Sequence, residues 1–460
     1  MTSKKTVWNI RSSVRFLLPL TLLGLSLNHG ALAQQTSPVH LTLDQAIDLA
    51  LKQNHSIHLR SLSVDEMQSK KDEARSNYFP QLKASGSVLH VTELAGVKIP
   101  AGAFGNFSTT GPVPSKPLFI DQGSATGYTG GVGLEQPITQ LLRIHQANIA
   151  AKQDILVAQT QLDQTQDAIA LQVRQIYYNI LINQQKLQAA QEQLATAKVK
   201  ADESRSDVQR GNALEVVILQ SDASILQDQQ QLLILKLQGE DLRRQLADIV
   251  GLPIRTSFDL DSEPNIQSLP MPTRDKAVQQ ALDQNQEVRA ARQTLEKAKA
   301  GLVAAKDAYI PNVTALSRYS YQSGIPLLVH NFGTFGFTLS YDLFDGGHRE
   351  AQVREARTQV RSAEVAIDKL QSEIEVQVQA AYDRIDELKQ MVDVAEQAVK
   401  VRTEAARLSD RQFEQNAALN SSKSQAHADL SNATASLLEA NMGLSLAEAD
   451  LKRTIGQMPR

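Results

Sequence analysis

The chain has 460 residues, of which 42% are hydrophobic and 21% are charged, an ordinary composition for a folded protein. Its formal net charge of −3 argues against a nucleic acid partner, because phosphate binding needs clustered lysine and arginine. The chain contains no cysteine, which excludes disulfide bonds and a lipid anchor attached to an N-terminal cysteine.

The first 33 residues have the pattern of a Sec-type signal peptide. An apolar run over 16–27 follows four basic residues, Lys4, Lys5, Arg11 and Arg15. Ala31-Leu32-Ala33 then forms an A-x-A cleavage site before Gln34. An anchored N-terminal helix is the alternative, but about 12 apolar residues are fewer than the roughly 20 that cross a bilayer. We expect export, cleavage between Ala33 and Gln34, and a net charge that falls from −3 to −7 with the four basic residues.

Two amphipathic helices are predicted over 43–78 and 274–309. Residues 231 positions apart match between them, namely Asp44 with Asp275, Ala46 with Ala277, Ala50 with Ala281 and Asn54 with Asn285. Both helices end in a Tyr-x-Pro sequence, at Pro80 and Pro311. Proline lacks a backbone donor and moves the preceding residue out of the helical region, so a strand should begin at each proline.

Four strands are predicted, over 81–91, 127–137, 312–322 and 333–343. Apolar side chains alternate with small or polar ones, most clearly where Phe335, Phe337 and Leu339 alternate with Gly336 and Thr338. Such alternation over about ten residues is typical of transmembrane β-barrels. A half-buried hairpin on a soluble core is the alternative, but export and duplication favour the membrane. No mature segment is apolar enough for a transmembrane helix.

Two proline-free rods are predicted over 138–210 and 347–415, after the strand ends marked by Pro137 and by Gly346-Gly347. Apolar residues recur every seven positions, as at Ile155, Leu162, Ile169 and Ile176, which is the pattern of helices packed lengthwise. At 1.5 Å per residue, about 70 residues span about 105 Å. A shift of 205 positions superposes one rod on the other.

The chain is therefore a tandem duplication, with repeats over 34–251 and 273–456, a connector over 252–272 and a tail over 457–460. Return helices are expected over 213–250 and 418–455, after turns at Gly211 and Asn416. One entering helix and one return helix together match a rod in length, which predicts that they stack end to end along it. The offsets of 231 and 205 leave 26 extra residues in the first half, expected as a long surface loop within 91–127.

Four strands in lipid would expose two unpaired edges, so the barrel must close with other chains. Two chains would give eight strands filled by side chains, whereas three give twelve strands and an aqueous lumen. A trimer is the smallest conducting solution.

The ordered set of features resembles the TolC-type outer-membrane efflux protein family: signal peptide, duplication, Tyr-x-Pro junctions, Gln136-Pro137, Asp345-Gly346-Gly347 and Gly211-x-x-Leu214. The resemblance covers about 43–456. It implies a mainly α fold with a small β part, in which a homotrimer forms a 12-stranded outer-membrane β-barrel continued by a long periplasmic α-helical barrel.

The resemblance also implies a function. The trimer would be a passive exit duct of a tripartite efflux pump or type I secretion system, held in outer-membrane lipid. Its partners would be a periplasmic adaptor and an inner-membrane pump of RND, ABC or MFS type.

The tip of the helical barrel departs from the best-known members of that family. Their tyrosine, arginine and two aspartates correspond here to Phe413, Ala418, Ser422 and Gln425, and their second tip glycine to Asn416. The first repeat has Val208, Val217 and Gln220 at the matching places. We expect an aperture closed by packing at Val208, Gly211, Leu214, Phe413, Asn416, Leu419, Ser422 and Gln425, with little block by multivalent cations, which need carboxylates.

No catalytic, cofactor or metal motif is found. Gly130-Gly131-Val132-Gly133 is assigned to the barrel, and His55 and His58 lack a third metal ligand. A periplasmic coiled-coil scaffold or adaptor is the main alternative, although it would need no lipid-facing strands. An exported hydrolase would need a nucleophile with a base and a compact core.

Overall fold

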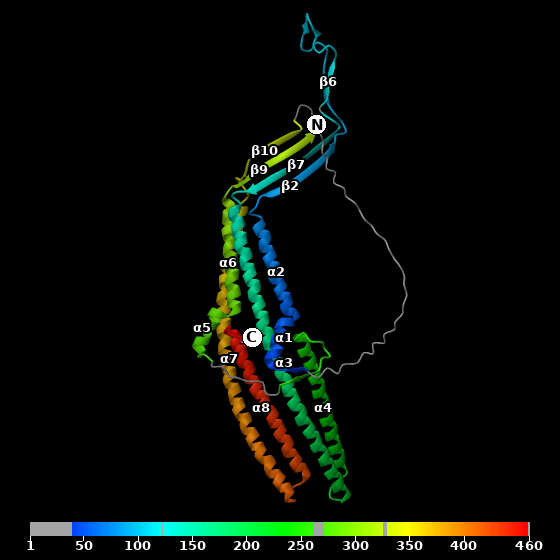
Figure 1. Cartoon of the computed structure of the whole chain (residues 1–460). Helices are drawn as coiled ribbons and strands as arrows, with labels where there is room; N and C mark the ends of the chain where they lie inside the picture. Colours follow the sequence, from blue (N-terminus) through cyan, green and yellow to red (C-terminus); the bar gives the residue numbers. More distant parts are fainter. Residues whose placement is uncertain (1–38, 122, 262–270, 325–328, 459–460) are drawn as a thin grey trace, which may run out of the picture.

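The computed structural model describes residues 39–121, 123–261, 271–324 and 329–458. The predicted signal peptide with its cleavage site at Ala33 and Gln34, residues 262–270 of the predicted connector and the last two residues lie outside these ranges. Figure 1 shows an elongated molecule with a sheet at one end and long helices running away from it. Among the described residues, none of the helices is both long and apolar enough to cross a membrane.

Each half of the chain contributes a hairpin and four main helices. The first half holds α1 (Leu43–Gln53), α2 (His55–Ser76), β2 (Gln81–His90), β7 (Thr126–Pro137), α3 (Leu141–Gln209) and α4 (Val216–Ile249). The second half holds α5 (Arg274–Gln284), α6 (Gln286–Lys306), the 3₁₀ turn η1 (Asp307–Tyr309), β9 (Asn312–Ser323), β10 (Asn331–Ser340), α7 (His348–Glu414) and α8 (Asn420–Thr454). The strand β10 ends at Ser340 rather than 343.

The strands and helices form a single layer, here called the wall, that is four elements wide. Neighbouring elements follow the same order across the wall from the sheet to the tip. The antiparallel sheet has the order β10-β9-β7-β2, so the two hairpins meet where β7 pairs with β9. Beside it, α7, α6, α3 and α2 follow in the same order, and α7, α8, α3 and α4 follow further down. The short helices α2 and α4 stack end to end along α3, as the helix lengths predicted.

The predicted entering helices are not continuous, which corrects the sequence analysis. Asn54 separates α1 from α2 and Asn285 separates α5 from α6, each with an extended backbone. The Asn285 side-chain oxygen accepts bonds from the N–H groups of Glu287 and Val288, and so caps α6. Its amide donates to the Thr454 carbonyl at the end of α8 (2.9 Å). Asparagine competes with the helical backbone in this way, so the break is built into the sequence.

The same joint occurs at Asn54, which caps α2 and donates to the Ile249 carbonyl at the end of α4 (2.9 Å). Both return helices then close with a left-handed glycine, Gly251 (φ 74°) or Gly456 (φ 76°). A Cβ on Gly456 would lie 2.6 Å from the Gln284 carbonyl oxygen, so only glycine allows this approach. Each joint therefore fastens a return helix to the break between two entering helices.

Replacing Asn285 with alanine should lower the free energy of unfolding by about 2 kcal/mol. The change removes a helix cap and leaves a buried carbonyl without its donor. Denaturant unfolding followed by circular dichroism measures the effect. The control is Asn77→Ala, because Asn77 is exposed at the end of α2; equal unfolding midpoints for the two variants would contradict this role for the joint.

The core lies midway along the wall, where α1 and α5 pack. One buried cluster joins α1, α3, α4 and β8 (Phe258–Leu260) around Tyr177, and another joins α5, α7 and α8 around Ile374 and Val378. Tyr177 donates to the carbonyls of Leu41 (3.1 Å) and Asp261 (3.2 Å), and burial raises its pKa to about 12. The strand β1 (Val39–Leu41) pairs in parallel with β8, although the sequence predicted no structure in either segment.

The predicted surface loop within 91–127 is itself a β-ribbon. Its strands are β3 (Gly96–Ile99), β4 (Asn106–Phe107), β5 (Gly111–Pro112) and β6 (Leu118–Asp121). β3 pairs with β6 and β4 with β5, so the ribbon extends beyond the sheet (Figure 1). Its many glycines and prolines, which suggested a loop, sit largely at the turns between these short strands.

Candidate functional site

The two tip turns have the backbone that the sequence predicted. Gly211, between α3 and α4, has φ 74°, and Asn416, between α7 and α8, has φ 56°. The side chains of Leu214 and Leu419 are exposed by 76% and 63%. Val208 is the second-last residue of α3. The apolar side chains at the turns are thus available for contacts beyond this chain.

Charged side chains contact one another at the second tip turn, between α7 and α8. The Lys423 ammonium lies 5.2 Å from the centre of the Phe413 ring and 3.6 Å from Asp410. His427 also contacts Asp410 (2.9 Å), and this hydrogen bond is the main reason that the pKa of the Asp410 carboxyl lies below its usual range. Phe413 is therefore positioned by α8 rather than free.

Residues from α8 also bind the tip to α3. Lys200 donates to the Gln425 side chain (2.7 Å), and the Ser421 amide donates to Glu203 (3.0 Å). Gln425 donates to Asp429 (2.8 Å), and the Ser422 amide bonds to the Leu419 carbonyl (3.1 Å) at the start of α8. The structure thus joins Gln425 to a network that sequence reasoning did not detect.

The junctions between sheet and helices are built by the predicted prolines and glycines. Pro80 and Pro311 precede β2 and β9, and Pro137 ends β7. Gly346 (φ 67°) and Gly347 (φ 84°) adopt left-handed backbones before α7. These conformations turn the chain from β10 into the helical direction.

An ion pair that the sequence analysis did not predict stabilises the turn between β10 and α7. Arg349 Nε donates to Asp345 (2.6 Å), and its guanidinium lies 4.8 Å from the centre of the Tyr341 ring. Asp345 also accepts from the backbone amides of Gly347 (3.0 Å) and Arg349 (3.1 Å). The hydrogen bond from Arg349 is the main reason that the pKa of Asp345 falls to about 2.

The turn between β10 and α7 should be stable to acid until the pH approaches the lowered pKa of Asp345. Because the pKa of Asp345 is lower in the folded protein, its contribution is complete above about pH 4 and is lost as the pH falls through about 2. Arg349→Gln should raise that pKa and shift acid unfolding to higher pH, measured by circular dichroism. Arg354→Gln is the control, since its pair with Glu350 is long (3.7 Å) and exposed; equal shifts would contradict the prediction.

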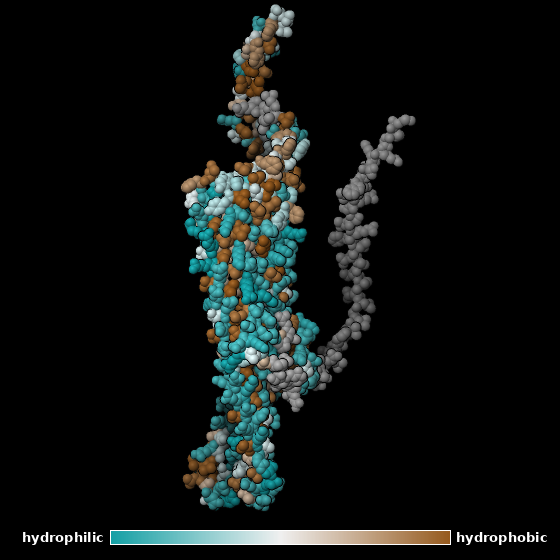
Figure 2. Space-filling model, turned by 90° about the vertical axis from the view of Figure 1, so that its left-hand side faces the viewer, coloured by the Kyte–Doolittle hydropathy of each residue, from teal (hydrophilic) through white to brown (hydrophobic). Residues whose placement is uncertain are grey.

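The two faces of the sheet differ in polarity, although Leu89, Leu316 and Phe332 lie on the more polar face. The register places apolar side chains on one face: Leu82, Ala84, Val88, Tyr128, Val132, Leu134, Val313, Ala315, Tyr319, Tyr321, Phe335, Phe337 and Leu339. The other face carries Lys83, Ser85, Ser87, Thr129, Glu135, Thr314, Arg318, Ser320, Thr334 and Thr338. Phe335 is 90% exposed, and Figure 2 shows hydrophobic surface gathered at the sheet end above mostly hydrophilic helices.

Both edges of the wall carry exposed apolar seams in the tip half. The α4 seam consists of Val216, Leu219, Ala223, Leu226, Leu233 and Leu237. The α7 seam consists of Met391, Val394, Ala398, Val401, Ala405 and Leu408. Both follow the alternating three- and four-residue spacing of a coiled-coil interface. The sequence analysis did not identify these two seams, and the fold shows that they face away from the chain's own helices.

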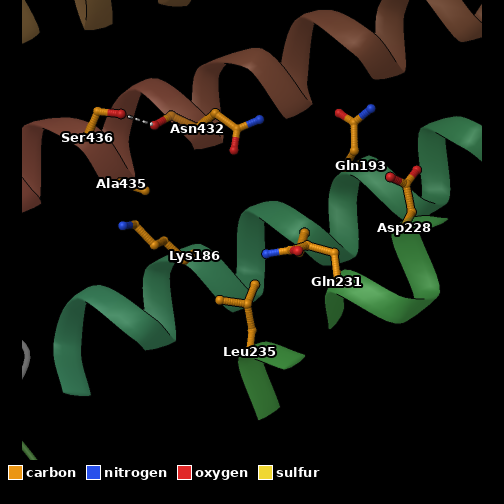
Figure 3. Close-up of a pocket in the computed structure, with 9 residues that line it drawn as sticks. Lys186, Gln193, Asp228, Gln231, Leu235, Asn432, Ala435 and Ser436 are labelled. Atoms are coloured by element: carbon orange, nitrogen blue, oxygen red, sulfur yellow. Dashed lines mark hydrogen bonds between the residues drawn. The ribbon is translucent and has the colours of Figure 1, made fainter. Parts of the chain in front are cut away.

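A polar groove of about 290 Å³ lies between α3, α4 and α8 (Figure 3). Its lining residues are Lys186, Ala190, Gln193, Asp228, Gln231, Leu235, Asn432, Ala435 and Ser436. Burial raises the pKa of Asp228, against the effect of Lys200. None of the lining residues forms a nucleophile–base pair, so we interpret the groove as a solvated space between helices. In the described part of the chain, no three His, Asp or Glu residues are grouped to hold a metal ion.

Comparisons with known proteins agree on one family and one fold. A family model described as "Outer membrane efflux protein" matches residues 46–252 and 277–457. The structure is similar to the Campylobacter jejuni CmeC outer membrane channel, with a TM-score of 0.73 and 15% identity over 90% of this chain and 85% of that one.

It is also similar to the open state of the Neisseria gonorrhoeae MtrE outer membrane channel (TM-score 0.70, 18% identity, 90% and 88% covered). The outer membrane protein VceC of Vibrio cholerae gives a TM-score of 0.68 at 16% identity, with 90% and 96% covered. A comparison with curated protein sequences gave no match. At these identities the structural likenesses show a shared fold.

Proposed function

The chain belongs to the outer membrane efflux protein family, and from this premise we propose that it forms a trimeric channel-tunnel that serves as a passive exit duct. Members of this family are channels rather than enzymes, and they act in the outer membrane. The duct would belong to a tripartite efflux pump or a type I secretion system.

The single observation that carries this proposal is the pair of open edges. The edge strands β2 and β10 leave backbone groups unpaired, and the α4 and α7 seams lie on the same two sides of the wall. Because α7 runs toward the tip and α4 away from it, the two seams can pair as an antiparallel coiled coil between neighbouring chains. Two different edges that meet head to tail close into a ring.

The number of chains follows from the number of strands. Each chain supplies four strands to the sheet, so two chains would give a barrel filled by side chains and three give twelve strands around an aqueous lumen. The apolar face would contact outer-membrane lipid, and the polar face would line the lumen. The helices would extend into the periplasm, after export directed by residues 1–33.

The helical tip would meet a periplasmic adaptor and an inner-membrane pump of RND, ABC or MFS type. The exposed Leu214 and Leu419 at the two turns support a docking role for this end. We propose that packing around Phe413, held by Lys423, closes the resting aperture. With Ser422 and Gln425 in place of carboxylates, multivalent cations should block the duct weakly.

Conductance of the detergent-extracted protein in a planar lipid bilayer tests the function. We expect small, flickering current steps from a crosslinkable trimer, and larger steps from Phe413→Ala if packing is the gate. Gln412→Ala is a matched control, because Gln412 is an exposed neighbour of Phe413 on α7 and is not one of the expected gate residues. Absence of conductance from all three proteins, together with extraction by salt alone, would contradict the duct and favour a periplasmic scaffold.

A further inference from the structure

The side chain of Arg318 lies across a neighbouring strand on the polar face of the sheet. Arg318 is in the middle of β9 and pairs with Gly133 of β7. A Cβ on Gly131 would lie 3.3 Å from Arg318 Nε, and one on Gly133 would lie 3.8 Å from its Cγ. The two glycines thus form a furrow that lets the guanidinium cross β7.

On the far side of the furrow, Arg318 Nη2 donates to the Ser85 hydroxyl of β2 at 3.0 Å. The arginine therefore spans three strands and is held in one place. A Cβ on Gly131 would also lie 2.6 Å from the Tyr319 carbonyl oxygen, so the close approach of the β9 backbone, as well as the Arg318 side chain, requires glycine there. The sequence analysis had assigned Gly131 and Gly133 to the barrel without a role for each position.

The charge of Arg318 is not balanced by a carboxylate. The four strands of the sheet carry three charged side chains, Lys83, Glu135 and Arg318, all on the polar face. Lys83 pairs with Glu135 at 2.9 Å. Arg318 forms no ion pair with any carboxylate among the described residues, and its one hydrogen bond is to a neutral hydroxyl. Each chain therefore contributes one net positive charge to this face.

We propose that three Arg318 side chains form a positive ring in the lumen of the barrel and make this section of the duct prefer anions over cations. The inference rests on the proposed trimer, in which the polar face lines the lumen. Low-dielectric walls concentrate the field of fixed charges within a narrow aqueous passage. The favoured solutes are small inorganic and organic anions such as chloride, carboxylates and phosphates.

The reversal potential of single channels under a potassium chloride gradient tests this ring. Measurements belong at low salt, because the Debye length is about 30 Å at 0.01 M but about 10 Å at 0.1 M. We expect the wild type to be anion-selective, Arg318→Gln to lower the anion-to-cation permeability ratio several-fold, and Arg318→Glu to invert it. Arg318→Lys should preserve the selectivity, because it preserves the charge.

The matched control is Lys83→Gln with Glu135→Gln, which removes two charges of opposite sign from the same face. It should leave the permeability ratio unchanged. Channels with equal ratios in the wild type, Arg318→Gln and Arg318→Glu would overturn the positive ring while leaving the duct intact. Absence of channels from the wild type would instead overturn the proposed function.

Discussion

A chain that carries Leu226→Glu together with Leu233→Glu should fold but fail to assemble into a trimer. Both leucines lie on the α4 seam and are exposed by 66% and 59% in the single chain, so their replacement costs the isolated fold little. In the ring, each glutamate would be buried without a partner, at a cost of several kcal/mol. The expected result is a monomer where the wild type gives a trimer, measured by light scattering of detergent-extracted protein.

The opposite edge provides an independent version of the same experiment. Val394→Glu with Val401→Glu places two carboxylates on the α7 seam and should have the same effect. The matched control is Gln227→Glu with Gln238→Glu, which adds equal charge to exposed positions of α4 outside the seam. A trimer from both seam variants would contradict pairing of α4 with α7.

The same substitution at two neighbouring residues of β10 should have different effects on the protein recovered in the outer membrane. Phe337 lies on the apolar face and is 77% exposed, whereas Thr338 lies on the polar face. Lysine on the lipid side of a barrel costs about 2–4 kcal/mol at the bilayer midplane, but a lumen-facing lysine is solvated. Phe337→Lys should therefore sharply reduce the protein recovered in the outer membrane, and Thr338→Lys should not.

This pair of variants also distinguishes the duct from a periplasmic scaffold. Fractionation of cells into outer membrane and periplasm, with quantification of the protein in each, is the measurement. A scaffold would leave the two variants alike in location. Equal recovery of Phe337→Lys and Thr338→Lys would thus remove the argument for a lipid-facing sheet.

The large features of the fold could be predicted because they depend on periodicity. A seven-residue repeat maintained over about 70 positions and a two-residue alternation over about ten leave few alternatives. The glycine and asparagine turns could be predicted for a similar reason, since left-handed backbones favour these residues. The family followed from the order of these signals along the chain.

Other features depended on contacts between distant segments, which periodicity does not encode. Asn54 and Asn285 stand within helical patterns, and only their bonds to the ends of α4 and α8 show that the helices break there. The Arg318 contact with Ser85 likewise joins separate strands. The ion pair between Asp345 and Arg349 is local, but it depends on the left-handed turn at Gly346 and Gly347. For the tip, the sequence predicted the turn positions, but not that Gln425 would join Lys200 and Asp429.

Two unlike edges have a consequence for gene dosage. A subunit with a defective α4 seam retains its α7 seam, so it can still occupy one side of a normal neighbour while preventing closure of the ring. In the proposed trimer, random mixing of normal and defective subunits in equal amounts would give only about one trimer in eight with three normal chains. A single altered allele would therefore suppress most of the activity of a normal copy, as a dominant trait.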